Sequence, residues 1–151
     1  MSWTLAFRSC LADRRGAVAI EFAAIALPFI LLLAGTMEIS RYTWTRVALQ
    51  DVASAGARCL GLGPRQVSDC FDGDSMNTEK TKGFVRQQGM VWGIRIDPSA
   101  ITPEQSGDCN GIGGSAKFAK VEILHTFTSV LPALPDSEIN VEACFPAAPS
   151  V

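Results

Sequence analysis

The chain has 151 residues, of which 48% are hydrophobic and 19% are charged, and its formal net charge at pH 7 is −2. This length allows one domain with an anchor and excludes two full domains. Residues 1–16 carry a net charge of +2, so the remainder carries −4. An acidic remainder argues against nucleic acid as a partner.

An apolar run from Ala17 to Met37 dominates the first part of the chain. As a helix it is long enough to cross the hydrocarbon core of a bilayer, which needs about 20 residues. Basic residues precede the run and predict a cytoplasmic N-terminus, with the rest of the chain outside the cytoplasmic membrane. A single carboxylate, Glu21, interrupts the run, and a charge at such a position is costly and usually functional. An uncleaved signal anchor would fit the hydropathy and leave Glu21 unexplained.

The start of this run carries a recognisable motif. Arg14-Arg15-Gly16, four small or apolar residues and then Glu21-Phe22 resemble the cleavage site of a class of type IV prepilins. In that class a membrane-embedded prepilin peptidase cuts after the glycine. The resemblance therefore implies a scissile bond between Gly16 and Ala17, and it makes Glu21 the fifth residue of the mature chain.

The segment from about Arg14 to Arg58 is similar to the TadE-like pseudopilins of Tad (tight adherence) pilus systems, which are type IVb. From there to Val151 the resemblance rests on size and strand patterning. It implies an α+β fold in which a long N-terminal transmembrane and stalk helix packs on a small antiparallel β-sheet head. The expected divisions are a prepilin leader at 1–16, the transmembrane and stalk helix at 17–60, and an extracytoplasmic head at 61–151.

The implied function is that of a minor pilin or pseudopilin that acts in pilus assembly, as a priming or tip subunit, and supports surface adhesion and biofilm formation. The protein would be a single-pass component of the bacterial inner membrane, with the head in the periplasm or carried into the extracellular pilus. Its implied partners are the prepilin peptidase, other pilins and pseudopilins, the inner-membrane assembly platform and membrane lipid. Glu21 and Phe22 are assigned to assembly, with Glu21 expected to pair with the freed amine of Ala17 on another subunit. No cofactor is expected.

The expected helix continues beyond Met37 as an amphipathic stalk and carries a light break at Pro28. Gly61-Leu62-Gly63-Pro64 is expected to end it, since the glycines favour a cap and the proline cannot continue the helix. A buried face is predicted for Ile39, Tyr42, Leu49, Val52, Ala53 and Ala57, and an outward face for Arg41, Arg46, Gln50, Asp51 and Arg58.

The remaining elements follow from turn residues and alternation. Residues 65–75 are predicted to form a polar loop, 77–88 a short helix, 91–97 a strand, and 98–115 a long loop. Residues 116–128 and 138–145 are predicted as two strands. The gap between these strands is too short for a crossover helix, so they are expected to pair antiparallel.

Four of the five cysteines lie in the exported part, namely Cys59, Cys70, Cys109 and Cys144, while Cys10 lies in the leader. An even number in an oxidising compartment predicts two disulfides. Three connectivities are open. The preferred one joins Cys59 to Cys70 and Cys109 to Cys144, because it ties the helix end to the following loop and a loop to the last strand. Zinc is the weaker alternative, since there is no Cys-x-x-Cys pair and one histidine, His125.

Other polar residues offer weaker candidates, and no enzymatic activity is expected from them. The oxygen-bearing side chains Asp72, Asp74, Asn77 and Glu79 suit calcium, but they lack EF-hand spacing, and a solvated turn with a helix cap is favoured. His125 has no assignable catalytic partner. Glu122 and Glu142 could mimic a glycosidase pair, although exposed strand carboxylates are common. Tyr42, Trp44 and Trp92 are either interface anchors or core residues.

Two other functions compete with the pilus role. One is a membrane-anchored periplasmic binding module or enzyme that uses the helix only as a tether. The other is a soluble secreted domain, which would lose the whole apolar run. Cleavage after Gly16 separates the first of these from a pilin, because a tethered enzyme needs no such cut.

Overall fold

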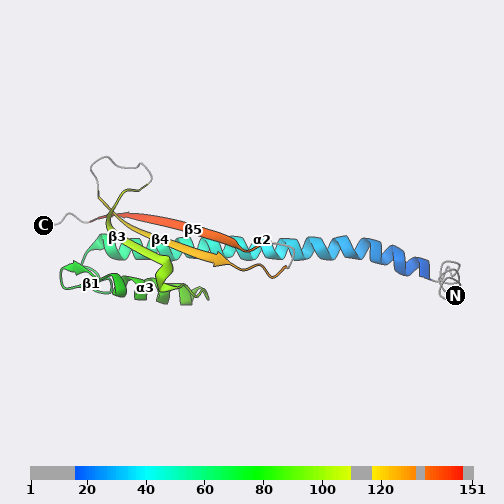
Figure 1. Cartoon of the computed structure of the whole chain (residues 1–151), viewed down its shortest axis with the longest axis horizontal. Coiled ribbons are helices and arrows are strands. Elements are labelled where there is room, and N and C mark those ends of the chain that lie inside the picture. Colours follow the sequence, from blue (N-terminus) through cyan, green and yellow to red (C-terminus); the bar gives the residue numbers. More distant parts are fainter. Residues whose placement is uncertain (1–15, 110–116, 132–134, 148–151) are drawn as a thin grey trace, which may run out of the picture. The chain divides into compact units, whose positions relative to one another are not determined.

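The computed structural model describes residues 16–109, 117–131 and 135–147. The chain forms two compact units, of which the first ends at Ile39 and the second begins at Ser40. Helix α2 (Ala17–Leu62) contributes residues to both units and contains Pro28 without a break. The long N-terminal helix and the small antiparallel sheets confirm the predicted α+β class (Figure 1).

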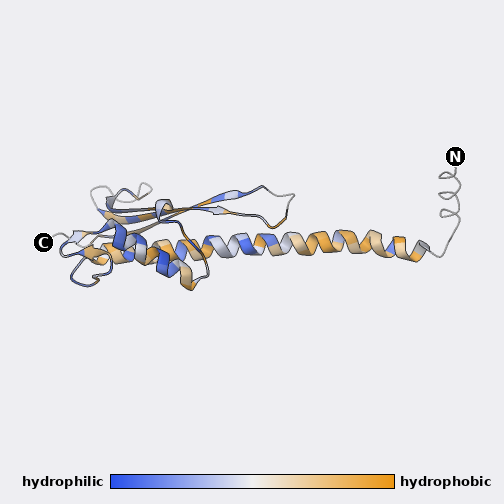
Figure 2. Cartoon of the chain, turned by 60° about the horizontal axis from the view of Figure 1, so that its bottom comes forward, coloured by the Kyte–Doolittle hydropathy of each residue, from blue (hydrophilic) through white to orange (hydrophobic). Residues whose placement is uncertain are grey.

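Between Val18 and Met37, the α2 residues other than Glu21 and Thr36 carry apolar side chains or none, as the hydropathy colours of Figure 2 indicate, and the large apolar side chains are exposed on all sides of the helix. Between half and three-quarters of each large apolar side chain is exposed, for Val18, Ile20, Phe22, Ile25, Leu27, Phe29, Ile30, Leu31, Leu32, Leu33 and Met37. A helix that is apolar on every side belongs inside a membrane or within a larger assembly. By length and composition, α2 is long and apolar enough to cross a membrane.

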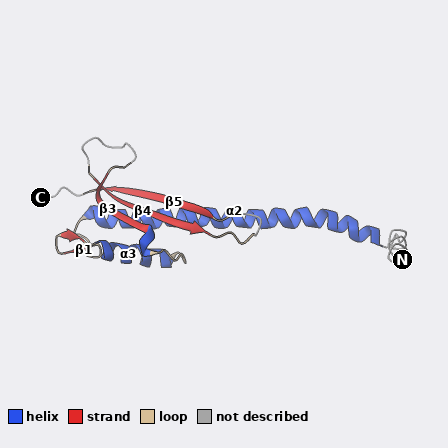
Figure 3. Ribbon diagram, in the orientation of Figure 1, coloured by secondary structure: helices blue, strands red, loops and turns tan. Residues whose placement is uncertain are grey.

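The second unit contains the head, whose elements Figure 3 colours by type. After α2 come β1 (Phe71–Asp72), β2 (Ser75–Met76), α3 (Thr78–Val91), the 3-10 turn η2 (Pro98–Ala100), β3 (Ile101–Gly107), β4 (Phe118–Phe127) and β5 (Ser137–Pro146). Strands β3, β4 and β5 form an antiparallel sheet in that order, and β1 pairs with β2 in a short hairpin. The predicted antiparallel pairing of the last two strands is confirmed.

The core of the head forms where α2, α3 and β4 meet. Gly56 of α2 lies against Val85 of α3 and Val121 of β4, so the absence of a side chain at Gly56 allows the three elements to approach closely. Leu49 and Val52 of α2 are also fully buried. The predicted buried face of α2 is confirmed except at Ile39, which is 68% exposed although its neighbour Glu38, on another side of the helix, is buried.

The predicted strand at residues 91–97 is wrong. Helix α3 runs to Val91, and Gly93 then adopts a left-handed conformation with φ of 75°. The amide of Ile94 donates to the carbonyl of Gly89 at 2.9 Å, and that of Gly93 donates to the carbonyl of Met90 at 3.0 Å. These two hydrogen bonds form a Schellman cap, so the glycine ended a helix where the alternating apolar residues had suggested a strand.

The predicted long loop at residues 98–115 is wrong in its first part, because β3 occupies Ile101–Gly107. Strand β3 lies at the edge of the sheet, where a proline such as Pro103 can be accommodated. Residues 110–116 lie outside the described residues. The polar loop expected at 65–75 also contains most of the β1–β2 hairpin, with Gly73 at a φ of 62° in its turn.

The predicted helix at 77–88 is confirmed and is longer than expected. The side chain of Asn77 caps its N-terminus by accepting a hydrogen bond from the amide of Lys80 at 3.0 Å. The hydroxyl of Thr81, which is fully buried, donates to the carbonyls of Asn77 and Cys70. Helix α3 is therefore joined at its start to the segment that follows α2.

Candidate functional site

The expected processing site lies at the start of α2. Gly16 is exposed, and α2 begins at the next residue, Ala17. Apart from its chain neighbours, no described residue has an atom within 4 Å of the position that a Cβ atom would occupy at Gly16. The described part of the chain therefore leaves the backbone at Gly16 uncovered, while Arg14 and Arg15 lie outside the described residues.

Glu21 and Phe22 lie one turn further along α2. Both side chains are exposed, and Phe22 is 73% exposed. The helical neighbours of Glu21 at the preceding and following turns, Val18 and Ile25, are apolar and equally exposed. Within the described residues, no hydrogen bond or ion pair is formed by the Glu21 carboxylate. A carboxylate on such a surface is stable inside a membrane or assembly when a cation from another chain pairs with it.

The paired carboxylates of the head do not have the arrangement of a hydrolytic site. Glu122 and Glu142 lie directly opposite each other in the β4–β5 register. Lys120 lies between them, with its Nζ atom 3.3 Å from Glu142 and 3.8 Å from Glu122. The hydrogen bond to Glu142 and the surrounding carboxylates raise the pKa of Lys120 above its usual 10.5. The cluster is thus a strand-to-strand ion pair that compensates two like charges.

The other polar candidates have local structural partners. Lys80 pairs with Asp72 at 3.3 Å, and Asn77 caps α3. Of the four residues considered for calcium, Asp72 and Asn77 thus have protein partners, as the favoured turn with a helix cap requires. His125 is half-buried in β4 opposite Ile139, and burial lowers its pKa below the usual 6.5, so it is neutral over most of the physiological range.

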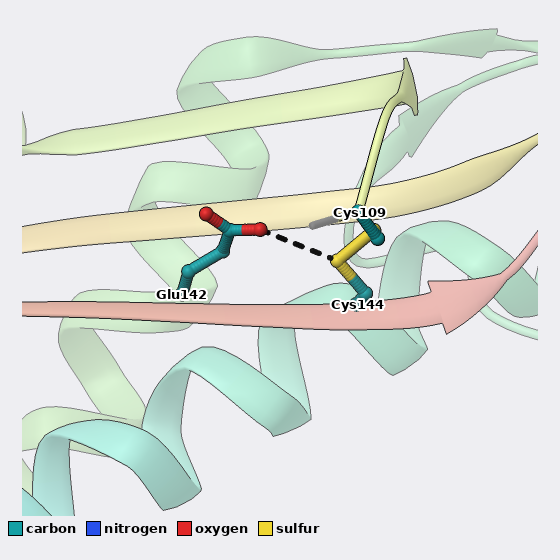
Figure 4. Close-up of side chains that lie close together, drawn as sticks. All are labelled: Cys109, Glu142 and Cys144. Carbon is teal, nitrogen blue, oxygen red and sulfur yellow. Dashed lines mark hydrogen bonds between the residues drawn. A yellow bond between two sulfur atoms is a disulfide. The ribbon is translucent and has the colours of Figure 1, made fainter. Parts of the chain in front are cut away.

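The four exported cysteines form two disulfides, Cys59–Cys70 and Cys109–Cys144, which is the pairing preferred from the sequence. The first ties the end of α2 to the β1–β2 hairpin. The second ties the segment after β3 to β5 and lies beside Glu142, as Figure 4 shows. An oxygen of Glu142 is 3.7 Å from the sulfur of Cys144, and this is a contact without a shared proton, since a disulfide sulfur has none to donate. Because both sulfurs are bonded to each other, this group of three side chains does not resemble a zinc site.

Two tryptophans, which the sequence could assign neither to the core nor to an interface, lie in contact at one end of the head. Trp44 of α2 and Trp92, the C-cap of α3, form an edge-on contact with ring centroids 5.6 Å apart. Trp44 is 59% exposed and Trp92 is 37% exposed, so neither is a core residue. Tyr42, by contrast, packs edge-on against Phe127 at 5.5 Å and against the core. The separation of 48 positions along the chain explains why the sequence could not join the two tryptophans.

Comparison with known proteins finds a similarity over the first part of the chain. The family model described as TadE-like protein matches residues 16–58. The chain is similar to that family over this segment, which includes Gly16, Glu21 and Phe22 and ends one residue before Cys59. The resemblance drawn from the sequence is confirmed there. No curated protein and no solved structure matches the chain.

Proposed function

We propose that this protein is a minor pilin or pseudopilin of a Tad-type, type IVb pilus, cut by a prepilin peptidase after Gly16 and active in pilus assembly. The TadE-like match associates the chain with the Tad pilus. The priming or tip role, and the support of adhesion and biofilm formation, are finer parts of the same proposal.

One observation carries the proposal: Glu21 is a carboxylate on an exposed, entirely apolar helix surface within the TadE-like segment. A charged group there costs free energy in a membrane unless it is paired, and a tether function alone gives no reason for a charge at this position. Cleavage after Gly16 creates a new cation, the amine of Ala17. Glu21 of one subunit and this amine of another form a neutral pair that leaves lipid far more readily than either ion alone.

The proposed location follows from the same helix. Residues 17–37 span the inner membrane with the N-terminus in the cytoplasm, and the head with its two disulfides lies in the oxidising periplasm. The subunit then joins other pilins and pseudopilins at the inner-membrane assembly platform. A membrane-anchored binding module would share the location but would have no use for Glu21.

The experiment replaces Glu21 in a strain whose own copy of the gene is deleted. Glu21→Gln keeps the size of the side chain and removes its charge, and it is expected to lower the number of surface pili by about tenfold or more, in line with the loss of a buried charged partner. The matched control is Asp51→Asn, which removes an exposed carboxylate from the same helix. The control is expected to restore pili as well as the unchanged gene does.

Both variants must remain in the membrane fraction at equal amounts for the comparison to report assembly. Normal pilus number in the Glu21→Gln strain would contradict the proposal and leave Glu21 as a hydrated residue at the membrane surface. Normal pilus number in the deletion strain itself would favour the tethered binding module.

A further inference from the structure

The end of the head at which the two tryptophans meet has an exposed apolar surface. Its five side chains come from two elements and are called here the tryptophan end: Trp44 and Val47 of α2, and Met90, Val91 and Trp92 at the end of α3. Val47 is 60% exposed, Met90 68% and Val91 78%. All five belong to the second compact unit.

This surface is held in place by the packing beneath it. The Schellman cap at Gly93 turns the chain sharply after Trp92, and the next apolar residues, Ile94 and Ile96, return to the core. Gly89 lies against Ile96, where an added Cβ would be 2.8 Å from Cδ1. The fold therefore buries Ile94 and Ile96 while it leaves Met90, Val91 and Trp92 exposed, and their exposure does not result from a loose chain end.

The charge around the tryptophan end is positive, although the head as a whole is acidic. Residues 40–51 and 84–97 contain four arginines (Arg41, Arg46, Arg86 and Arg95) and two acidic residues (Asp51 and Asp97), a net charge of +2. The second unit has a net charge of −2 overall, so the rest of it carries −4. Arg46, Arg86 and Arg95 are exposed and lie within ion-pair distance of no described carboxylate, although the charge of Arg86 helps to lower the pKa of Asp97. Exposed tryptophans beside exposed arginines are the chemistry that the headgroup region of an anionic bilayer binds.

The chain itself brings this surface near a membrane. Trp44 follows Met37, the end of the apolar run, by seven residues, so the chain holds the two residues within about 25 Å of each other however the two units are oriented. A residue this close in the chain to the apolar run is within reach of the headgroup layer. Contact between two copies of the tryptophan end is disfavoured, because it would bring two sets of four arginines together.

We propose that the tryptophan end docks the head on the anionic surface of the membrane that α2 crosses, with Trp92 inserted at the level of the lipid headgroups. The occupant of this surface is phospholipid. The docking fixes the orientation of the head on the membrane before the subunit enters the pilus. This inference rests on the membrane anchoring in the proposed function, and the test separates the two.

The test uses tryptophan fluorescence of the full chain in vesicles of phosphatidylglycerol and phosphatidylcholine with brominated acyl chains. The chain has three tryptophans. Trp3→Phe with Trp44→Phe therefore leaves Trp92 as the one reporter, located in the head and outside α2. The control reporter replaces all three and adds Asp74→Trp in the exposed turn of the β1–β2 hairpin, at the other end of α3. Quenching of Trp92 is expected to exceed that of the control by about threefold or more, since only Trp92 reaches the lipid.

The arginines and the apolar contact are tested separately. Pure phosphatidylcholine, or about 0.5 M salt, is expected to reduce the quenching of Trp92 by half or more, because screening weakens attraction to anionic lipid. Arg86→Glu with Arg95→Glu is expected to have the same effect at low salt. Val91→Asp changes a 78% exposed side chain, so it leaves the fold intact, and it is expected to reduce quenching in every vesicle.

Extraction with alkali measures anchoring by α2 independently. Protein that resists extraction while Trp92 is quenched no more than the control overturns the docking and leaves the proposed anchoring intact. Protein that alkali releases overturns both. A third outcome is Trp92 emission that is shifted to the blue, is not quenched by brominated lipid, and changes with the ratio of protein to lipid. This outcome would show that a protein surface covers the tryptophan end, and it would overturn the proposal.

Discussion

At the scale of single residues, the clearest electrostatic feature of the head is Lys120, which separates the opposed carboxylates of Glu122 and Glu142. Its side chain is 18% exposed, and it bonds the nearer carboxylate at 3.3 Å. Like charges directly opposite each other on neighbouring strands destabilise a sheet. The ammonium group of Lys120 lies on the same face of the sheet and attracts both carboxylates, which offsets their mutual repulsion.

Lys120→Met is therefore expected to lower the free energy of unfolding by about 1 kcal/mol at neutral pH, since it leaves the two carboxylates facing each other. Because the pKa of Lys120 is raised in the folded state, its contribution is complete below the usual value of 10.5 and disappears as the pH rises through the higher folded value. Urea unfolding of both proteins near neutral pH and above about pH 11 measures the difference. Lys117→Met, at an exposed residue just before β4, is the control, and an equal loss in both variants would contradict the assignment.

Gly16 and Gly35 offer a matched pair for the processing site. At neither glycine does another described residue come within 4 Å of where a Cβ would lie, chain neighbours and helix backbone aside, so a larger side chain disturbs no described contact at either position. Gly16→Leu is expected to reduce cleavage by the cognate peptidase by about tenfold or more, because the side chain blocks approach to the backbone. Gly35→Leu is expected to be cleaved normally. Electrophoresis after coexpression measures both, and equal cleavage would contradict the assignment of Gly16.

At the scale of elements, the head depends on the close approach of α2 to both α3 and β4 at Gly56. An added Cβ would be 2.8 Å from a methyl group of Val85 and 3.3 Å from one of Val121. Both neighbours are β-branched and stiff, so they cannot move aside as a flexible side chain would. The packing of three elements is thus determined at one small residue.

Gly56→Ala is expected to destabilise the head by about 1–2 kcal/mol, the cost of overpacking after the gain in helix propensity. Gly83→Ala places the same methyl group on α3, where no described side chain or neighbouring element lies within 4 Å, and it is expected to stabilise the head by about 0.5–1 kcal/mol. Thermal unfolding of the two variants under the same conditions gives the comparison. A Gly56→Ala protein that unfolds at a higher temperature than the unchanged protein would contradict this, because it would show that α2, α3 and β4 accommodate the extra methyl group without a loss of stability.

Elements with local signals were predictable from the sequence. Helix α2 follows from its apolar run, α3 from its cap at Asn77, and β4 and β5 from alternation. Strand β3 was missed because Pro103 and Gly107 are residues of turns unless a strand lies at an edge, and its place at the edge depends on β4 pairing from a distance. The apparent strand after Val91 failed for the opposite reason, since one glycine cap outweighed the apolar alternation.

The candidate site was predictable to a different extent. Gly16, Ala17, Glu21 and Phe22 lie within seven consecutive positions, so a sequence motif was enough to select them as candidates, and the family match covers all four while their roles stay predictions. The tryptophan end was not predictable, because the contact between Trp44 and Trp92 depends on how α3 folds back beside α2. The lysine between Glu122 and Glu142 depends in the same way on strand register.

At the scale of the whole molecule, the chain has two parts with different requirements. The first unit exposes an apolar helix that only a membrane or an assembly can cover. The second is small, and its two disulfides supplement a core of limited size. One helix contributes to both parts, so the segment proposed to enter the filament is covalently continuous with the helix on which the head is built.

The most direct test of the proposed pilin role is the intact mass of the protein extracted from the membranes of piliated cells. The expected mass is that of residues 17–151, beginning at Ala17, with Cys59, Cys70, Cys109 and Cys144 all oxidised. The mass of the full 151-residue chain, in cells that carry pili, would contradict it.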